Sequence, residues 1–286
     1  MSAPRRRWWR YATAAAAASI SALLLAALTP AAAAPATIDG MPVDEYVARY
    51  DHPMGSQISR VEGDHSAAET KAMASGDLSA AAEVQGIDVS GHQGNVDWSG
   101  HWGQGRRFAY VKATEGTYYT NPYFAQQYNG SYDVGMIRGA YHFATPDSAS
   151  GAAQANYFVD HGGGWSADGK TLPGALDMEY NPYGSTCYGM PKSAMGAWIK
   201  DFSDTYRSRT GRYPVIYTST SWWDQCVGAS FSTTSPLWVA RYASSVGALP
   251  YDWDYHTFWQ YSSTPIDQNV FNGSYERLQV LATSKD

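Results

Sequence analysis

Two carboxylates separated by one residue are the part of this sequence best suited to chemistry. Asp177 and Glu179 end a short apolar run that opens with a Pro173–Gly174 turn, and Met178 lies between them. Alternate residues of a β-strand share a face, so we expect both acids to point the same way. Like charges that close cannot both ionise freely, which raises one pKa and keeps that carboxyl protonated near neutral pH. The pair therefore predicts a proton donor, with an exposed strand end carrying two solvated acids as the alternative.

Eight short apolar runs predict the strands that must position this pair. They span 86–90, 108–114, 136–143, 176–179, 214–218, 237–240, 257–261 and 268–271. The stretches between several of these runs, at 122–132, 151–160 and 191–209, have a composition compatible with helices. In the last stretch, one apolar face recurs at helical spacing through Met195, Trp198, Ile199, Phe202 and Tyr206.

Strands that alternate with helices favour an α/β fold with a parallel sheet. Eight strands in about two hundred residues suit a closed, TIM-like barrel whose last third is poor in helix. An open doubly wound sheet is the alternative architecture. Its nucleotide-binding version is weakened because no Gly-x-Gly-x-x-Gly follows a strand.

Polar residues fall near the carboxyl ends of most runs, where the chemistry of a β/α barrel gathers. Besides the central pair they are Asp88, Lys112, Glu115, His142, Tyr217, Gln260 and Asp267. Several have a structural alternative. Lys112 with Glu115 could form an ion pair, and His142 could be a buried structural histidine. Tyr217 could be core packing and Asp267 a turn residue. Their convergence on one rim favours a functional site.

Several carboxylates on one rim suit the hydrolysis of a glycosidic bond. That reaction needs a protonated carboxyl for the leaving oxygen and a second group that supports the charge developing at the sugar carbon. Aromatic residues make up 14% of the chain, and Trp and Tyr, which can stack on sugar rings, outnumber Phe. Neither Gly-x-Ser-x-Gly nor His-Glu-x-x-His occurs, which argues against an elbow-type serine hydrolase and a zinc protease. A net charge of −6 argues against nucleic acid as a partner.

Residues 1–36 predict a secretory signal peptide. A basic stretch at 5–10 precedes an uncharged Ala- and Leu-rich stretch at 11–28, and small residues suited to signal cleavage follow Pro30. A membrane anchor is the alternative. Export implies an oxidising compartment, in which Cys187 and Cys226 have one possible disulfide pairing. No zinc-ligand spacing surrounds them, and we predict neither a metal nor a cofactor.

Residues 37–85 predict a linker or pro-region that is partly disordered. Val43–Tyr50 could form a short helix that 52–55 ends. The stretch 66–83 is rich in Ala, Ser and Glu and has almost no large apolar residue, so it cannot bury much core. The catalytic domain is expected at 86–286.

Six ordered blocks of this sequence are distinctive when taken together. They are GIDVSGHQGNVDW at 86–98, FAYVKATEG at 108–116, RGAYHF at 138–143, LDME at 176–179, VIYT at 215–218 and FWQY at 258–261. In this order they resemble glycoside hydrolase family 25, the Ch-type lysozymes. The similarity is greatest to secreted actinobacterial members, which carry cysteines that match Cys187 and Cys226. In one departure, 91–93 reads Gly-His-Gln where many members have His-Trp-Gln, so the tryptophan is missing.

This resemblance implies a barrel of the (β/α)5(β)3 type and a lysozyme that cleaves the β-1,4 bond between N-acetylmuramic acid and N-acetylglucosamine in peptidoglycan. Glu179 matches the general acid of the family. Asp177 matches the carboxylate that steers the substrate's own acetamido group as nucleophile. Asp88 and Asp267 match further rim carboxylates of the catalytic set.

The resemblance also implies that Tyr141, Tyr217 and Trp259 line the sugar cleft. Glu115, His142 and Gln260, which the strand pattern brings to the same rim, complete the expected substrate-binding set. We expect a secreted monomer that has no stable membrane association after signal removal. The alternatives are a non-catalytic wall-binding module and a glycosidase of another N-acetylated glycan such as chitin.

Overall fold

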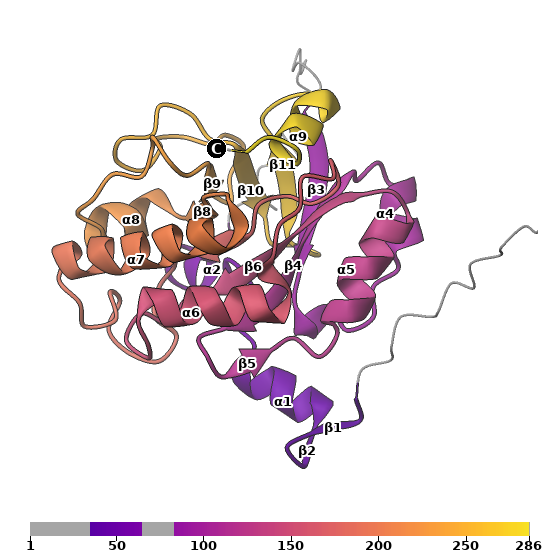
Figure 1. Ribbon diagram of the computed structural model, residues 1–286, viewed down its shortest axis with the longest axis horizontal. Helices are drawn as coiled ribbons and strands as arrows, with labels where there is room; N and C mark the ends of the chain where they lie inside the picture. The colour runs from indigo at the N-terminus through magenta and orange to yellow at the C-terminus, as the bar shows by residue number, and fades with distance from the viewer. Residues whose placement is uncertain (1–34, 65–82, 286) are drawn as a thin grey trace, which may run out of the picture. The chain divides into compact units, whose positions relative to one another are not determined.

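Eight strands close into a barrel in the computed structural model, which describes residues 35–64 and 83–285 (Figure 1). The barrel strands are β3 (Val84–Val89), β4 (Phe108–Glu115), β6 (Ile137–Phe143), β7 (Ala175–Asp177), β8 (Val215–Thr218), β9 (Leu237–Ala240), β10 (Phe258–Ser262) and β11 (Gln268–Phe271). Their order around the barrel is β3-β11-β10-β9-β8-β7-β6-β4, and the pairing of β3 with β4 closes the ring. The predicted closed barrel is confirmed, and the open sheet is excluded.

The barrel is not parallel throughout, which corrects the expectation of a parallel sheet. Strand β11 runs antiparallel to both of its neighbours, β10 and β3, whereas the other neighbouring barrel strands pair in parallel. The physical reason is the short connection between β10 and β11, because a parallel pair needs a crossover of about a dozen residues or more. A further short strand, β5 (Tyr119–Thr120), pairs antiparallel with the end of β4.

Helices follow the first five strands of the barrel and then become sparse, as the sequence predicts. They are α4 (Trp98–Gly103), α5 (Phe124–Asp133), α6 (Gly151–Phe158), α7 (Lys192–Thr210), α8 (Thr220–Cys226) and α9 (Tyr275–Leu281), with the short turns η1 (Gly91–Gln93) and η2 (Val159–Gly163). The apolar face predicted for α7 is buried. This helix ends at Gly211, whose φ of 79° is the left-handed conformation that glycine favours at a helix end. Within the described ranges, no helix is long and apolar enough to cross a bilayer.

Large aromatic rings fill the barrel interior and leave its polar residues to one end. The rings of Phe108, Tyr110, Trp238 and Phe258 are fully buried and in mutual contact, with the Tyr110 and Trp238 centroids 4.7 Å apart. The alternate residues of β4 pack outward against α4 and α5. Since Phe108 and Tyr110 point inward, Lys112 at the carboxyl end of the same strand also points inward. The polar site therefore lies above an aromatic floor.

The N-terminal segment, residues 35–64, folds against this barrel as part of the same compact unit. It comprises β1 (Thr37–Ile38), β2 (Met41–Pro42), α1 (Val43–Tyr50) and α2 (Ser56–Glu62). The predicted helix at 43–50 is confirmed with the same bounds. The predicted signal sequence falls almost entirely on 1–34 and the Ala- and Ser-rich stretch on 65–82, so both lie outside the described residues.

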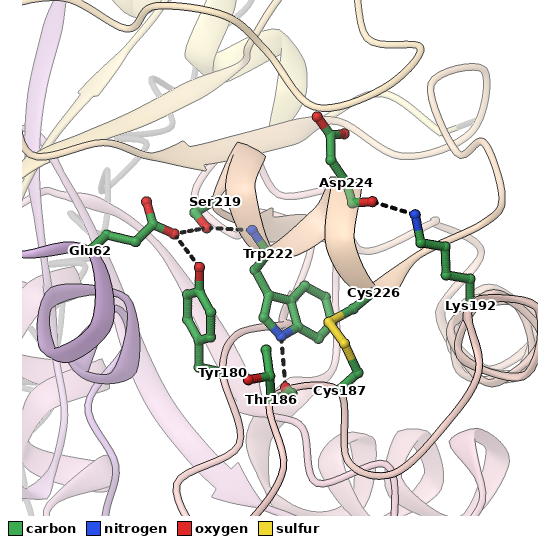
Figure 2. The surroundings of a disulfide bond; sticks show 9 residues. All are labelled: Glu62, Tyr180, Thr186, Cys187, Lys192, Ser219, Trp222, Asp224 and Cys226. Carbon is green, nitrogen blue, oxygen red and sulfur yellow. Dashed lines mark hydrogen bonds between the residues drawn. A yellow bond between two sulfur atoms is a disulfide. The ribbon is translucent and has the colours of Figure 1, made fainter.

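The predicted disulfide is present between Cys187 and Cys226, with their Cα atoms 5.4 Å apart (Figure 2). It ties the loop after β7 to the end of α8. The Trp222 indole donates to the Thr186 carbonyl at 3.1 Å beside it. The crosslink therefore fixes the stretch of chain that directly follows the Asp177–Glu179 pair.

Candidate active site

The four acids predicted to be catalytic lie together at the carboxyl end of the barrel. Asp88 comes from β3, Asp177 and Glu179 from the end of β7, and Asp267 precedes β11. Each is at most 8% exposed. Their charges act on one another. Burial is the largest cause of the raised pKa of Asp177, and the charges of Glu179 and Asp88 raise it further. Strand alternation and barrel closure thus produce the cluster that the sequence pattern predicts.

Asp177 is the acid that lacks hydrogen-bond donors. Both of its carboxylate oxygens are buried, and neither has a hydrogen-bond partner among the residues that the structure describes. Burial first and the charge of Glu179 second raise its pKa well above the ordinary value. A buried acceptor without a donor is costly, because it has lost its water and gained nothing in return. Asp177 is therefore prepared to accept a donor from a ligand.

Glu179 has the opposite surroundings, because three backbone N–H groups donate to its carboxylate. They belong to Gly55 at 2.8 Å, Gln57 at 2.8 Å and Ile58 at 3.0 Å. Burial raises the pKa of Glu179 to about 8, although these three donors act to lower it. All three come from the N-terminal segment. A carboxyl with a pKa near neutrality is suited to giving up a proton at the barrel rim.

A hydrogen-bond network of side-chain amides holds Asp88. Its Oδ2 accepts from Gln260 Nε2 at 2.8 Å and from Asn269 Nδ2 at 2.7 Å. Burial raises its pKa to about 7, while the two amides act to lower it. Gln260 Oε1 in turn accepts from the hydroxyls of Tyr217 at 2.5 Å and Tyr242 at 2.8 Å. The amide orientation of Gln260 is thereby fixed, which directs its N–H toward Asp88.

The structure brings Tyr141, Tyr217 and Gln260 to the acid cluster. Tyr141 is fully buried, and its pKa is raised by burial and further by the nearby charges of Asp88 and Asp177. Tyr217 pairs with Asp177 in the β7–β8 register and hydrogen-bonds Gln260. Sequence reasoning missed two neighbours of this network, Tyr242 and Asn269. The need of a buried Asp88 for donors could have indicated Asn269, whereas Tyr242 contacts Gln260 and no signal in the sequence marks it.

Glu115 lies at the same end of the barrel within an ion-pair network. Its Oε2 is 2.7 Å from Lys112 Nζ, and its Oε1 is 2.8 Å from His52 Nδ1. Burial alone would raise the pKa of Glu115, but Lys112 and His52 lower it to about 2. Lys112 also pairs with Asp51 at 2.8 Å. The ion pair named as the structural alternative for Lys112 and Glu115 is therefore present.

His142 is not brought to the acids, which corrects its place in the expected substrate-binding set. It follows Tyr141 on β6, and because Tyr141 points inward, His142 points toward α6 and α7. Its ring nitrogens contact Thr114 Oγ1 at 2.7 Å and Gln154 Oε1 at 2.9 Å, and the ring packs on Phe202. Burial lowers its pKa to about 4, which keeps it neutral. The buried structural histidine is the correct interpretation.

Trp259 takes the face of β10 opposite to Gln260. Its indole N–H donates to the Arg241 carbonyl at 2.8 Å, and its ring contacts Tyr261. Since Gln260 points toward Asp88, strand alternation directs Trp259 away from the acid cluster. A role for Trp259 in the sugar cleft stays a prediction. Across the described ranges, no group of three or more His, Cys, Asp and Glu side chains is arranged to hold a metal ion.

Comparisons with known proteins agree with this geometry. The sequence model of glycosyl hydrolases family 25 matches residues 87–270. Lysozyme M1 of Streptomyces globisporus is 49% identical over 70% of this chain and 72% of its own length. The N,O-diacetylmuramidase of Chalaropsis sp is 50% identical over 70% of this chain and 99% of its own length. The solved structure of a muramidase from Acremonium alcalophilum is 55% identical, with a TM-score of 0.68, and covers 70% of this chain and 99% of its own.

Proposed function

The chain belongs to glycosyl hydrolases family 25, and we propose that it is a secreted lysozyme that hydrolyses the β-1,4 bond between N-acetylmuramic acid and N-acetylglucosamine of peptidoglycan. The observation that carries the mechanism is the pair of buried Asp177 oxygens without a donor beside Glu179. Asp177 and Glu179 together supply the two groups with different roles that glycoside hydrolysis requires.

Glu179 is the general acid. Its raised pKa, about 8 with burial as the largest cause, supports a protonated carboxyl at neutral pH. Such a carboxyl can protonate the glycosidic oxygen as the bond to the sugar carbon breaks. The aromatic barrel floor beneath it and the crosslinked loop after it keep this group in a fixed position.

Asp177 orients the nucleophile, which comes from the substrate. An acetamido N–H would give its carboxylate the donor that it lacks, and would thereby direct the acetamido oxygen at the sugar carbon. The donated hydrogen bond favours the ionised form of Asp177, whose negative charge then stabilises the positive charge that develops on that group. Asp88 and Asp267, whose pKa values burial raises, add to the negative potential of the rim when ionised. Substrate assistance is a recognised exception to the two-carboxylate scheme.

The site is built on rigid elements that hold the sugar-binding groups. Tyr141 and Tyr217 supply hydroxyls on neighbouring parts of the rim, and Gln260 orients Asp88. Glu115 supports the rim through its ion pair with Lys112. We place the catalytic domain at 86–286, a removable signal peptide at 1–36 and a pro-region within 37–85. The Cys187–Cys226 disulfide supports export, since such bonds persist in oxidising compartments.

Product analysis tests this proposal. Purified peptidoglycan is digested with the protein, both intact and after removal of residues 35–64, and the fragments are identified by mass spectrometry. Reducing-end muramic acid is the expected product. Reducing-end glucosamine, or release of sugars from chitin alone, would reject the muramidase. Wall binding with no new reducing ends would favour the non-catalytic module instead.

A further inference from the structure

Residues of the N-terminal segment occupy the position from which a polysaccharide would reach the acids. Helix α2 begins at Ser56 and has no side-chain cap of its own. The free N–H groups of its first turn need acceptors, and Glu179 supplies both carboxylate oxygens to them. The catalytic acid thus serves as the cap of this helix. No described contact of comparable kind exists between Asp177 and the segment.

The close approach at Gly55 leaves no room for a ligand between the segment and the barrel. Gly55 has a φ of 78°, and its carbonyl accepts from the Tyr242 hydroxyl at 3.1 Å. A Cβ added at this glycine would overlap the Tyr242 hydroxyl and lie 2.5 Å from that of Tyr217 and 2.6 Å from Gln260 Oε1. The backbone therefore enters a space that only a residue without a side chain can fill.

Charged groups fix the chain just before this glycine. Asp51 of the segment is 2.8 Å from Lys112 Nζ, and the side chains of both are fully buried. Lys112 Nζ also donates to the His52 carbonyl at 2.6 Å, and the backbone N–H of His52 donates to Glu115 at 3.0 Å. The segment therefore binds the barrel through complementary charges as well as through the acid.

Apolar and polar anchors continue on both sides of Gly55. Met54 and Ile58 are each 1% exposed and belong to the barrel core, and the Met54 N–H donates to the Tyr141 hydroxyl at 3.1 Å. At the other end of α2, Glu62 accepts from the hydroxyls of Tyr180 and Ser219 beside the disulfide (Figure 2). Contacts thus extend along the whole of 51–62 rather than resting on one residue.

We propose that the N-terminal segment is an intramolecular inhibitor that occupies the sugar cleft and keeps the enzyme inactive until the segment leaves. The proposal rests on the function proposed above, because it takes Glu179 as the acid. The segment excludes the glycosidic oxygen from Glu179, because its three backbone N–H groups already occupy both carboxylate oxygens.

The covalent connection explains why the segment would remain bound. A tethered partner has an effective concentration of about a millimolar, whereas after a cut it is diluted to the concentration of the protein. The family match begins at residue 87, beyond the segment. The Acremonium muramidase structure covers 70% of this chain and 99% of its own, so that relative folds with almost nothing beyond the shared part. The barrel is therefore expected to keep its fold once the segment leaves.

The test uses the full exported chain with the recognition sequence of a specific protease introduced between residues 64 and 83. Release of reducing ends from peptidoglycan is measured before and after the cut, at about micromolar protein. We expect the cut to raise the rate by about a hundredfold or more after dilution. Equal rates from intact and cut chains would overturn the inhibitor and leave the lysozyme standing. A cut chain without muramidase products would reject the lysozyme.

A matched pair of glycine variants tests the mechanism in the uncut chain. Gly55→Ala forces a Cβ into the cleft contacts, so we expect the rate to rise toward that of the cut chain. Gly40→Ala is the control, because Gly40 also has a positive φ, of 80°, but an added Cβ there meets nothing within 4 Å. It should leave the uncut chain inactive. No rise with Gly55→Ala, or an equal rise with both, would contradict the proposal.

A synthetic peptide of residues 35–64 gives a readout that does not depend on activity. It should bind the cut and separated barrel by calorimetry, and it should inhibit in competition with soluble peptidoglycan fragments. The same peptide with Gly55→Ala should bind at least about tenfold more weakly. Absence of binding at millimolar peptide would overturn the inhibitor whatever the barrel hydrolyses.

Discussion

Asp177 and Glu179 point to the same side of one strand end, yet Glu179 accepts three backbone N–H groups, whereas Asp177 accepts none from the residues that the structure describes. Both carboxyls are buried, and burial is the largest cause of the raised pKa of each. The difference between them lies in their hydrogen-bond partners. Asp177 can still accept a donor from a substrate, whereas the segment occupies both oxygens of Glu179 and must leave before a glycosidic oxygen can reach them.

Glu179→Gln should nearly abolish hydrolysis by the cut chain. The amide cannot protonate the leaving oxygen, so we expect a loss of about 10²- to 10⁴-fold in kcat. Reducing-end release from peptidoglycan measures it, and circular dichroism checks that the variant is folded. A variant that retains full activity would remove Glu179 from the role of acid.

In the cut chain, Asp177→Asn should lower kcat by about a hundredfold or more while changing KM less. The neutral amide loses the charge that supports the acetamido group as it attacks. Because both oxygens of Asp177 lack donors in the described structure, the folded state should tolerate the change well. Initial rates over a range of peptidoglycan fragment concentrations separate kcat from KM. A rise in KM alone would indicate a binding role instead.

Asp88→Asn should change how the stability of the intact chain depends on pH. Burial raises the pKa of Asp88 to about 7 in the folded state, against about 4 when unfolded. Between these values the folded chain holds a proton that the unfolded chain has released, so stability from this group falls as the pH rises from about 4 to 7. One titrating group can change the free energy of unfolding by at most about 1.4 kcal/mol per pH unit.

Urea unfolding of both proteins at a series of pH values measures this effect as a difference. The subtraction is needed because His142, whose pKa burial lowers to about 4, acts with the opposite sign in much of the same range. The parent should lose stability relative to Asp88→Asn as the pH rises. Parallel stability curves would show that folding does not change the pKa of Asp88.

Neighbouring residues on β6 should have separable roles. Tyr141→Phe removes a hydroxyl at the acid cluster. We expect it to raise KM of the cut chain by about fivefold, which corresponds to the loss of one ordinary hydrogen bond to the substrate. The stability of the cut chain should not change. His142→Gln should cost about 1–3 kcal/mol of stability and leave kcat/KM within about twofold, because His142 packs between strand and helices. The reverse pattern would show that His142 faces the cleft.

The Cys187–Cys226 disulfide should contribute about 4 kcal/mol to the free energy of unfolding, given the 39 residues that separate the two cysteines. Replacing both by Ala removes the constraint on the unfolded chain. Urea unfolding of the double variant, compared with the parent in the absence of reductant, measures the loss. An unchanged midpoint would mean that the loop after β7 is held by its other contacts.

Much of the barrel and the acid cluster could be predicted because they follow from side-chain patterns. Apolar runs gave the strands, and the strict alternation along a strand put Asp177 and Glu179 on one face. The same alternation could have excluded His142, since Tyr141 and His142 are adjacent and only one can point inward. The direction of β11 was also readable from its short connection to β10.

The docking of the N-terminal segment could not be predicted from the sequence. Its contacts with Glu179 use backbone N–H groups, which every residue except proline has, so no side-chain type marks them. Gly55 is needed for a close approach to residues that are about 160 or more positions away in the sequence. Only the folded structure shows that these residues are neighbours in space. Local propensity predicted the helix at 43–50 but not the surface of the barrel against which its segment packs.

Glu179 caps α2, so the catalytic carboxylate itself supplies the acceptors that hold the inhibitory segment in place. Glutamine at position 179 would offer one acceptor oxygen in place of two and would turn an amide N–H against those of the segment. The change that removes catalysis therefore also weakens inhibition. A change at this carboxylate that weakens the hold of the segment also removes the proton donor, so an enzyme that is both free of its segment and active must arise from a change elsewhere in the chain.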